Sequence, residues 1–108
     1  MFARHLTFKL KPNTQKDYIK VFQNDLMPLL RKQPGFRDLI TLADDDGTDL
    51  TAISFWDTRE QAVAFGNTAY ASTLKMGEKF LDGAPKVRVL HVFQSTAHNL
   101  SPATEAAA

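Results

Sequence analysis

Residues 36–65 read FRDLITLADDDGTDLTAISFWDTREQAVAF, and this stretch contains two strands, the turn between them and the start of a helix. Residues 36–43 and 50–56 alternate between apolar and polar letters, as half-buried strands do. The letters DDDG at residues 44–47 are typical of a turn between antiparallel strands, because aspartate tolerates left-handed geometry and glycine adopts it freely. A calcium loop is the alternative, but its alternating ligands and final glutamate are missing. We therefore expect an antiparallel hairpin.

A helix in two pieces and a last strand follow the hairpin. Asp57 is the expected N-cap, with Glu60 reaching back to it as in a capping box. Residues 66–68 (GNT) interrupt the helix, and a second piece is predicted from about residue 69 to residue 81. Residues 86–94 (KVRVLHVFQ) alternate again and predict a strand. The second helical piece stacks four residues along one side: Tyr70, Leu74, Gly77 and Leu81.

The part of the chain before the hairpin predicts one strand and one helix. Residues 2–10 alternate strictly, which indicates a strand. The helix begins near Thr14 and ends at residues 33–35 (QPG). Pro28 lies inside it, and because an internal proline lacks a backbone N–H and clashes with the preceding turn, we expect a kink near residues 24–27. The apolar stripe of this helix consists of Ile19, Phe22, Leu26 and Leu29.

The resulting order is β-α-β-β-α-β, which predicts an α+β, ferredoxin-like fold with a four-stranded antiparallel sheet. Helices cover one face of such a sheet. The other face also collects apolar residues, including Ile53, Phe55, Leu90 and Val92, and so needs a second cover. We therefore expect a homodimer packed sheet to sheet. Residues 1–94 are expected to form a single domain, and residues 95–108 a C-terminal tail that is frayed or laid on the partner subunit.

Composition excludes several classes of function. With 13 Lys+Arg against 12 Asp+Glu, the net charge of +1 offers no basic surface for nucleic acid or an anionic membrane. The apolar runs are far shorter than the roughly 20 residues that span a bilayer, so we interpret the chain as soluble and cytoplasmic. Cysteine is absent, and no two of the three histidines have helical i, i+4 spacing. No metal site is predicted.

Two motifs resemble the antibiotic biosynthesis monooxygenase (ABM) domain of the dimeric α+β barrel superfamily. They are residues 33–36 (QPGF), and residues 55–65 (FWDTREQAVAF) after the hairpin. The resemblance extends over residues 2–94. It implies a homodimer with a pocket between sheet and helices in each subunit. It also implies a monooxygenase that oxidises a small aromatic or quinol-like substrate with molecular oxygen and no cofactor.

The chain departs from the catalytic members in several places. Some quinone-forming members have an asparagine four residues before the tryptophan and a tyrosine six residues after it, where this chain has Ala52 and Ala62. Haem-degrading members have a histidine on the second helical segment, and residues 68–81 contain none. A non-catalytic dimer that binds a small hydrophobic molecule, or a stress-related module, is therefore the alternative function.

The alternation of the strands gathers five polar or aromatic residues on the helix-facing side of the sheet: Arg4, Ser54, Trp56, Tyr70 and His91. Histidine as a residue type is suited to act as a general base near neutral pH, so His91 is the candidate base, and Arg4 carries the permanent charge that would stabilise a substrate anion. Trp56, Ser54 and Tyr70 are the predicted substrate-binding residues. The competing interpretation is structural. His91 would be a hydrogen-bonded residue of the core or interface, Arg4 would extend to water, and Trp56 would pack the strand against the helix. Catalysis would need a buried titratable group within about 3 Å of a substrate hydroxyl, whereas binding alone needs apolar walls. For catalysis, His91 and Arg4 should point into an enclosed cavity on the order of a few hundred Å³, the lower end for ligand pockets.

Overall fold

The expected four-stranded antiparallel sheet is confirmed in a computed structural model that describes residues 1–98 and residue 100. The strands are β1 (Phe2–Lys9), β2 (Phe36–Ala43), β3 (Asp49–Trp56) and β4 (Lys86–His91), in the order β2-β3-β1-β4. All three neighbouring pairs are antiparallel. The ferredoxin-like order is thus the observed one, although β4 ends at His91 and not at residue 94.

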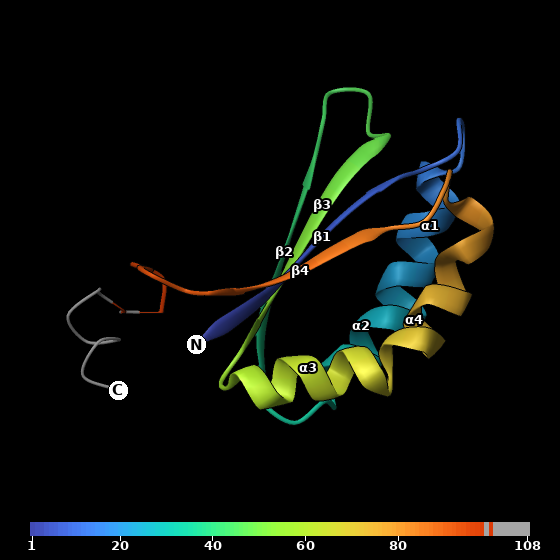
Figure 1. Ribbon diagram of the computed structural model, residues 1–108. Coiled ribbons are helices and arrows are strands. Elements are labelled where there is room, and N and C mark those ends of the chain that lie inside the picture. The colour runs from blue at the N-terminus through green and yellow to red at the C-terminus, as the bar shows by residue number, and fades with distance from the viewer. Residues whose placement is uncertain (99, 101–108) are drawn as a thin grey trace.

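The helices of the described chain lie along one face of this sheet (Figure 1). The first helical segment consists of α1 (Gln15–Val21), a π-helical turn η1 (Phe22–Leu26) and α2 (Met27–Arg31). The second consists of α3 (Arg59–Asn67), α4 (Tyr70–Gly77) and a 3-10 turn η2 (Glu78–Phe80). Both segments pack against the residues of β1 and β3 whose side chains point toward the helices.

The kink expected before Pro28 takes the form of the π-helical turn η1. A proline cannot donate the backbone hydrogen bond that an α-helix needs, and the wider π turn accommodates that loss. The wide turn also changes which residues face the sheet. Ile19, expected inside, is 51% exposed. Phe22 and Leu26 face inward as expected, whereas Tyr18 and Leu30 line the interior in place of Ile19 and Leu29.

Helix α3 begins one residue later than predicted. Thr58 is its N-cap, and the Thr58 hydroxyl accepts a hydrogen bond of 3.1 Å from the backbone N–H of Gln61. Asp57 does not cap the helix, because its carboxylate pairs with the Arg37 guanidinium of β2. The prediction of a capping box with Asp57 and Glu60 was therefore wrong, although the predicted start of the helix was correct to within one residue.

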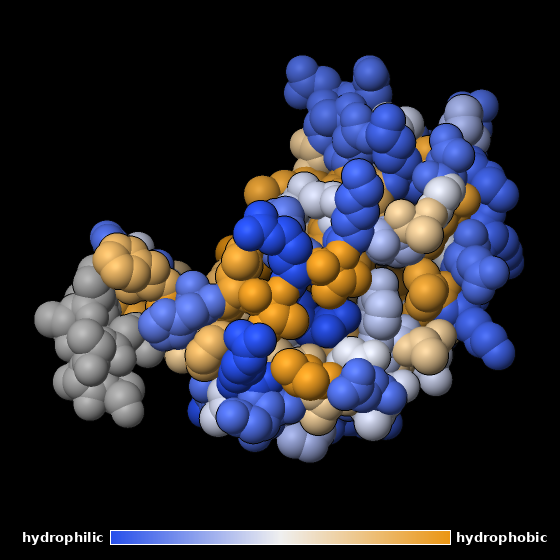
Figure 2. All heavy atoms as spheres, in the orientation of Figure 1, coloured by the Kyte–Doolittle hydropathy of each residue, from blue (hydrophilic) through white to orange (hydrophobic). Residues whose placement is uncertain are grey.

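The face of the sheet turned away from the helices, called the outer face here, is not covered by any described helix (Figure 1). The strand register places Ile40, Ile53, Phe55 and Leu90 on it. Ile40 is 43% exposed and Leu90 is 36% exposed. Figure 2 shows apolar side chains gathered over the strands, whereas the end of the β2–β3 hairpin is hydrophilic. Exposed apolar groups on a sheet face are typical of an interface.

Part of the C-terminal tail contacts the outer face of its own chain. The rings of His98 and Phe55 have centroids 5.3 Å apart, and His98 Nε2 lies 3.7 Å from the Asp38 carboxylate. The remainder of the predicted tail, residue 99 and residues 101–108, lies outside the described residues. Within the described part of the chain, no helix is long and apolar enough to cross a membrane.

Candidate active site

A cavity of about 100 Å³ lies between the sheet and the helices. It is smaller than the sequence-based expectation, and its volume is closer to the roughly 150 Å³ of a cavity that holds benzene. All four residues predicted to stack along the second helical piece line it. The apolar walls come from every layer of the fold: Leu6, Phe8, Phe22, Leu26, Leu30, Leu39, Ala52, Phe65, Leu74, Gly77, Leu81 and Pro85. The polar lining consists of Arg4, Tyr18, Ser54, Tyr70 and Thr73.

Arg4 is the charged residue of this cavity. Strand β1 directs it toward the helices, and only 7% of the residue is exposed. Its guanidinium carbon lies 4.8 Å from the ring centroid of Tyr70 and 5.3 Å from that of Phe65, distances at which a cation is attracted to an aromatic face. Gly66 on α3 makes room for the guanidinium, because a Cβ at this position would overlap Nη1 of Arg4. Sequence reasoning read Gly66 as a helix break and missed this role.

Burial shifts the ionisation of the groups around Arg4. Desolvation lowers the pKa of Arg4, and Tyr70 partly raises it again. An arginine remains protonated in proteins, so the cavity keeps a positive charge. Desolvation raises the pKa of Tyr70 above its ordinary value, and the charge of Arg4 offsets part of that rise. Burial raises the pKa of Tyr18 to about 12. Both phenols are consequently neutral hydrogen-bond donors at neutral pH.

Trp56, predicted to bind the substrate, is a core residue that does not line this cavity. It is 0% exposed, stacks on Phe65 with ring centroids 5.0 Å apart and meets Phe36 edge to face. Its indole Nε1–H donates a hydrogen bond of 2.9 Å to the Ser54 hydroxyl. Because a hydroxyl also has one O–H to donate, Ser54 can still offer a hydrogen bond to a ligand.

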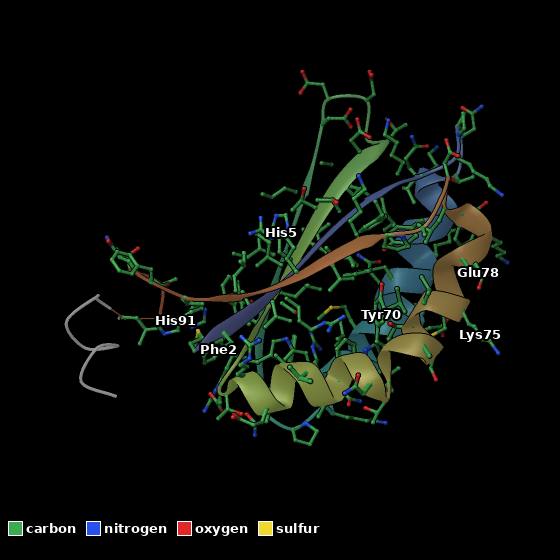
Figure 3. All side chains as sticks on the ribbon, viewed as in Figure 1. Phe2, His5, Tyr70, Lys75, Glu78 and His91 are labelled. Carbon is green, nitrogen blue, oxygen red and sulfur yellow. The ribbon has the colours of Figure 1, made fainter. Side chains whose placement is uncertain are left out.

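His91 does not line the cavity. It shares the helix-facing side of the sheet with Arg4, but the residue opposite Arg4 is Val89, and His91 lies further along β4, opposite Phe2. The imidazole is exposed and its centroid is 5.0 Å from that of the Phe2 ring. Figure 3 shows Tyr70 on the side of α4 that faces the sheet and His91 at the far end of the sheet. The predicted pairing of His91 with Arg4 was therefore wrong.

A second hollow of about 140 Å³ lies on the other side of Phe65 and Trp56. Among the described residues, none that lines it is charged. Residues 1–98 and residue 100 also contain no group of three or more His, Asp or Glu side chains that could hold a metal ion. The charged group of Arg4 thus distinguishes the first cavity as the candidate site.

The arrangement of a sheet, two broken helical segments and a cavity between them has a counterpart among known families. The sequence model of the ABM family, antibiotic biosynthesis monooxygenase, matches residues 1–75. The chain belongs to the ABM family. The matched range covers β1, β2, β3 and the elements that carry Arg4, Ser54 and Tyr70. No curated protein matches the chain.

Several solved structures share the fold. The monooxygenase from the gene ActVA-Orf6 of Streptomyces coelicolor, in complex with nanaomycin D, is 23% identical with a TM-score of 0.69, covering 87% of this chain and 88% of that one. A mutant of SnoaB, a cofactor-independent oxygenase of Streptomyces nogalater, is 14% identical with a TM-score of 0.71, covering 88% and 95%. Rv0793 of Mycobacterium tuberculosis is 18% identical with a TM-score of 0.68, covering 88% and 97%.

Proposed function

We propose that this ABM protein is a monooxygenase that oxidises a small aromatic hydroxyl compound with molecular oxygen and without a cofactor. The observation that carries the proposal is the apolar cavity with the buried guanidinium of Arg4 in its wall. Apolar walls with a few polar groups are typical of sites for small aromatic molecules. The nanaomycin D complex of the Streptomyces coelicolor neighbour supports a small-molecule ligand for this fold.

The proposed reaction balances without an external reductant. A phenol with an unsubstituted ring position reacts with one molecule of oxygen and gives a quinone and water. One C–H bond of the ring becomes a C=O bond that contains one atom of the oxygen molecule, the hydroxyl becomes the other C=O group, and the second oxygen atom leaves as water. All four electrons come from the phenol. The protein's part is to orient the ring and to stabilise negative charge on its oxygen.

The volume of the cavity favours a substrate with a single ring. At about 100 Å³ the space is smaller than that of most ligand pockets, which begin near 300 Å³. Fused tricyclic compounds would require the walls to move apart. Ala52 is one of the residues that determine the cavity volume. Its methyl group lines the cavity at the position where some quinone-forming members have an asparagine.

We expect oxygen uptake with single-ring phenols and hydroquinones, and slower uptake with dihydroxynaphthalenes and anthrones, which fit the cavity less well. An oxygen electrode measures the rate, and the autoxidation of each compound without protein is subtracted. Absence of uptake with all of these compounds would contradict the proposal. Such a result, together with binding of the same phenols, would favour the second candidate, a non-catalytic binding module. Ala52, Ala62 and the position of His91 outside the cavity favour that candidate.

The outer face is proposed to pair with a second copy of the chain. Exposed and half-buried apolar residues of this face lie on β2, β3 and β4, and no described helix covers them. Pairing two such faces sheet to sheet would remove them from water, and burial of apolar area is the main driving force of such association. Val92, considered in the sequence as part of this face, is only 8% exposed within its own chain and so makes a poor test position.

Leu90→Asp or Ile40→Asp is expected to convert a dimer into a monomer of 12.1 kDa. Burying the unpaired carboxylate of the new aspartate in a dry interface costs several kcal/mol, which disfavours the dimer. Sedimentation velocity at micromolar concentration measures the change. Val63→Asp, on the exposed side of α3, is the matched control and should remain a dimer. A wild-type protein that sediments as a monomer would contradict the proposed interface.

A further inference from the structure

The cavity contains an anion-binding group but no base. Of the described residues that line it, only Arg4, Tyr18 and Tyr70 can ionise. None of the described lining residues is an aspartate, glutamate, histidine or lysine. Oxidation of a phenol by oxygen requires the electron-rich phenolate, so the proton of the phenol must be removed somewhere. The side chains in the cavity do not include a group suited to this step.

Arg4 meets mostly uncharged groups from the elements packed around it. Ser54 of β3 and Val89 of β4 are its partners in the two strand pairs, and the rings of Phe65 on α3 and Tyr70 on α4 lie against its guanidinium. The ion pairs found within the described residues involve Lys9, Arg37 and His98, and not Arg4. The next titratable group on the same side of the sheet is His91, which is exposed beyond the cavity. The positive charge of Arg4 is thus not compensated by a carboxylate.

We propose that the cavity selects its substrate already ionised: the phenol loses its proton to water, and Arg4 binds the oxygen of the phenolate. This inference rests on the function proposed above and names the form of the substrate that the site accepts. In the reaction, phenolate and oxygen give quinone and hydroxide, so that atoms and charge balance without a proton acceptor in the protein. The acidity of the substrate, and not that of a side chain, then sets the pH dependence.

The ionisable side chains of the cavity support this selection. Tyr18 and Tyr70 are neutral phenols at neutral pH, and burial raises both pKa values further, so neither is an effective proton acceptor there. Binding of a phenolate by a buried, uncompensated guanidinium forms a charge-assisted hydrogen bond, which is stronger than one between neutral groups. Below the pKa of the substrate, the neutral phenol predominates in solution. Apparent affinity and kcat/KM should therefore both increase as the pH rises through the pKa of the substrate.

The test uses phenols with none, one and two ortho chlorine atoms, all with an unsubstituted para position. Each chlorine lowers the pKa of the phenol, so the midpoint of the kcat/KM profile should move to lower pH by the same shift as the measured pKa. Below the midpoint, kcat/KM should fall about tenfold per pH unit, as expected for one ionisation. A midpoint that stays constant across the series would show that a protein group is the base and would overturn the inference. Tyr70→Phe should leave each midpoint in place, and loss of the midpoint would identify Tyr70 as the base.

Calorimetric binding separates this inference from the proposed function. If no phenol is oxidised, the proposed function fails, but the affinity of the wild-type protein for each phenol can still be measured as a function of pH. Affinity that rises through the pKa of each phenol supports selection of the anion. Equal affinity for the neutral and ionised forms contradicts it, whatever the outcome of the turnover assay.

Discussion

Replacement of Arg4 by methionine is expected to reduce turnover by about 10²–10³-fold, the usual effect of removing one group that stabilises an oxyanion. The reason is that the described lining of the cavity offers no second positive charge. Methionine has an unbranched side chain that can fill the space of the arginine stem. Because an apolar residue of similar volume replaces a buried charge, the fold should be retained or slightly stabilised. Arg59→Met, at the exposed start of α3, is the matched control and should keep full activity.

Binding of benzoate and benzamide shows whether the charge of Arg4 is the cause. Both molecules have one ring and nearly the same shape, and only benzoate is an anion. In calorimetric titrations, Arg4→Met should weaken the binding of benzoate and leave that of benzamide nearly unchanged. Equal losses for both ligands would mean that Arg4 only shapes the cavity, and would contradict its proposed role.

Gly66→Ala tests the position of the guanidinium while its charge is kept. The added methyl group would overlap Nη1 of Arg4, and the end of this flexible side chain would have to move. Since alanine is favoured over glycine within a helix by about 1 kcal/mol, stability should not fall. Benzoate affinity should decrease all the same. Asn67→Ala, at the exposed neighbouring position of α3, should leave benzoate affinity unchanged.

Trp56→Ala is expected to cost about 3–5 kcal/mol of the free energy of unfolding, as other tryptophan truncations in protein cores do. The residue is 0% exposed and packs against Phe36 and Phe65, so its removal leaves a void under both helical segments. The Ser54 hydroxyl would also lose the indole N–H that it accepts. The free energy of unfolding of a protein domain is only about 5–15 kcal/mol, so this loss is a large fraction of the total stability.

Urea unfolding followed by circular dichroism measures this loss, because the variant lacks the only tryptophan as a fluorescent probe. Val63→Ala removes an exposed side chain from α3 and should change stability by less than about 0.5 kcal/mol. Trp56→Phe should lie between the two. A Trp56→Ala variant as stable as the Val63→Ala control would show that Trp56 is not part of the core and would reopen the prediction that it contacts the ligand.

Strand alternation correctly predicted the side of the sheet on which the candidate site residues of the strands lie. Arg4 and Ser54 line the cavity, and His91 is on the same side, as the alternation indicated. Alternation does not, however, indicate how far along a strand a residue lies relative to the cavity. His91 is the last residue of β4 and lies beyond the cavity. The residue paired with Arg4 is Val89, two positions before His91.

The helices were harder to predict because one local irregularity changes their period. A stripe with a period of 3.6 residues placed Ile19 inside, whereas the π turn before Pro28 brings Tyr18 there. Pro28 was the available signal, since the hydrogen bond that it cannot make favours a wider turn. Trp56 was misassigned for another reason. Its side of the sheet was correct, but the hydrogen bond to Ser54 that holds it behind the wall is a contact that composition and spacing do not reveal.

The reaction in oxygen-18 gas and ordinary water tests the central claim most directly. Mass spectrometry of the quinone formed from a single-ring phenol should show one labelled oxygen atom per molecule, at a rate that Arg4→Met lowers by about 10²–10³-fold. This result would establish insertion of one atom of molecular oxygen at the cavity of Arg4. An unlabelled quinone accompanied by two molecules of hydrogen peroxide per quinone, or labelling that proceeds equally well in Arg4→Met, would contradict the account.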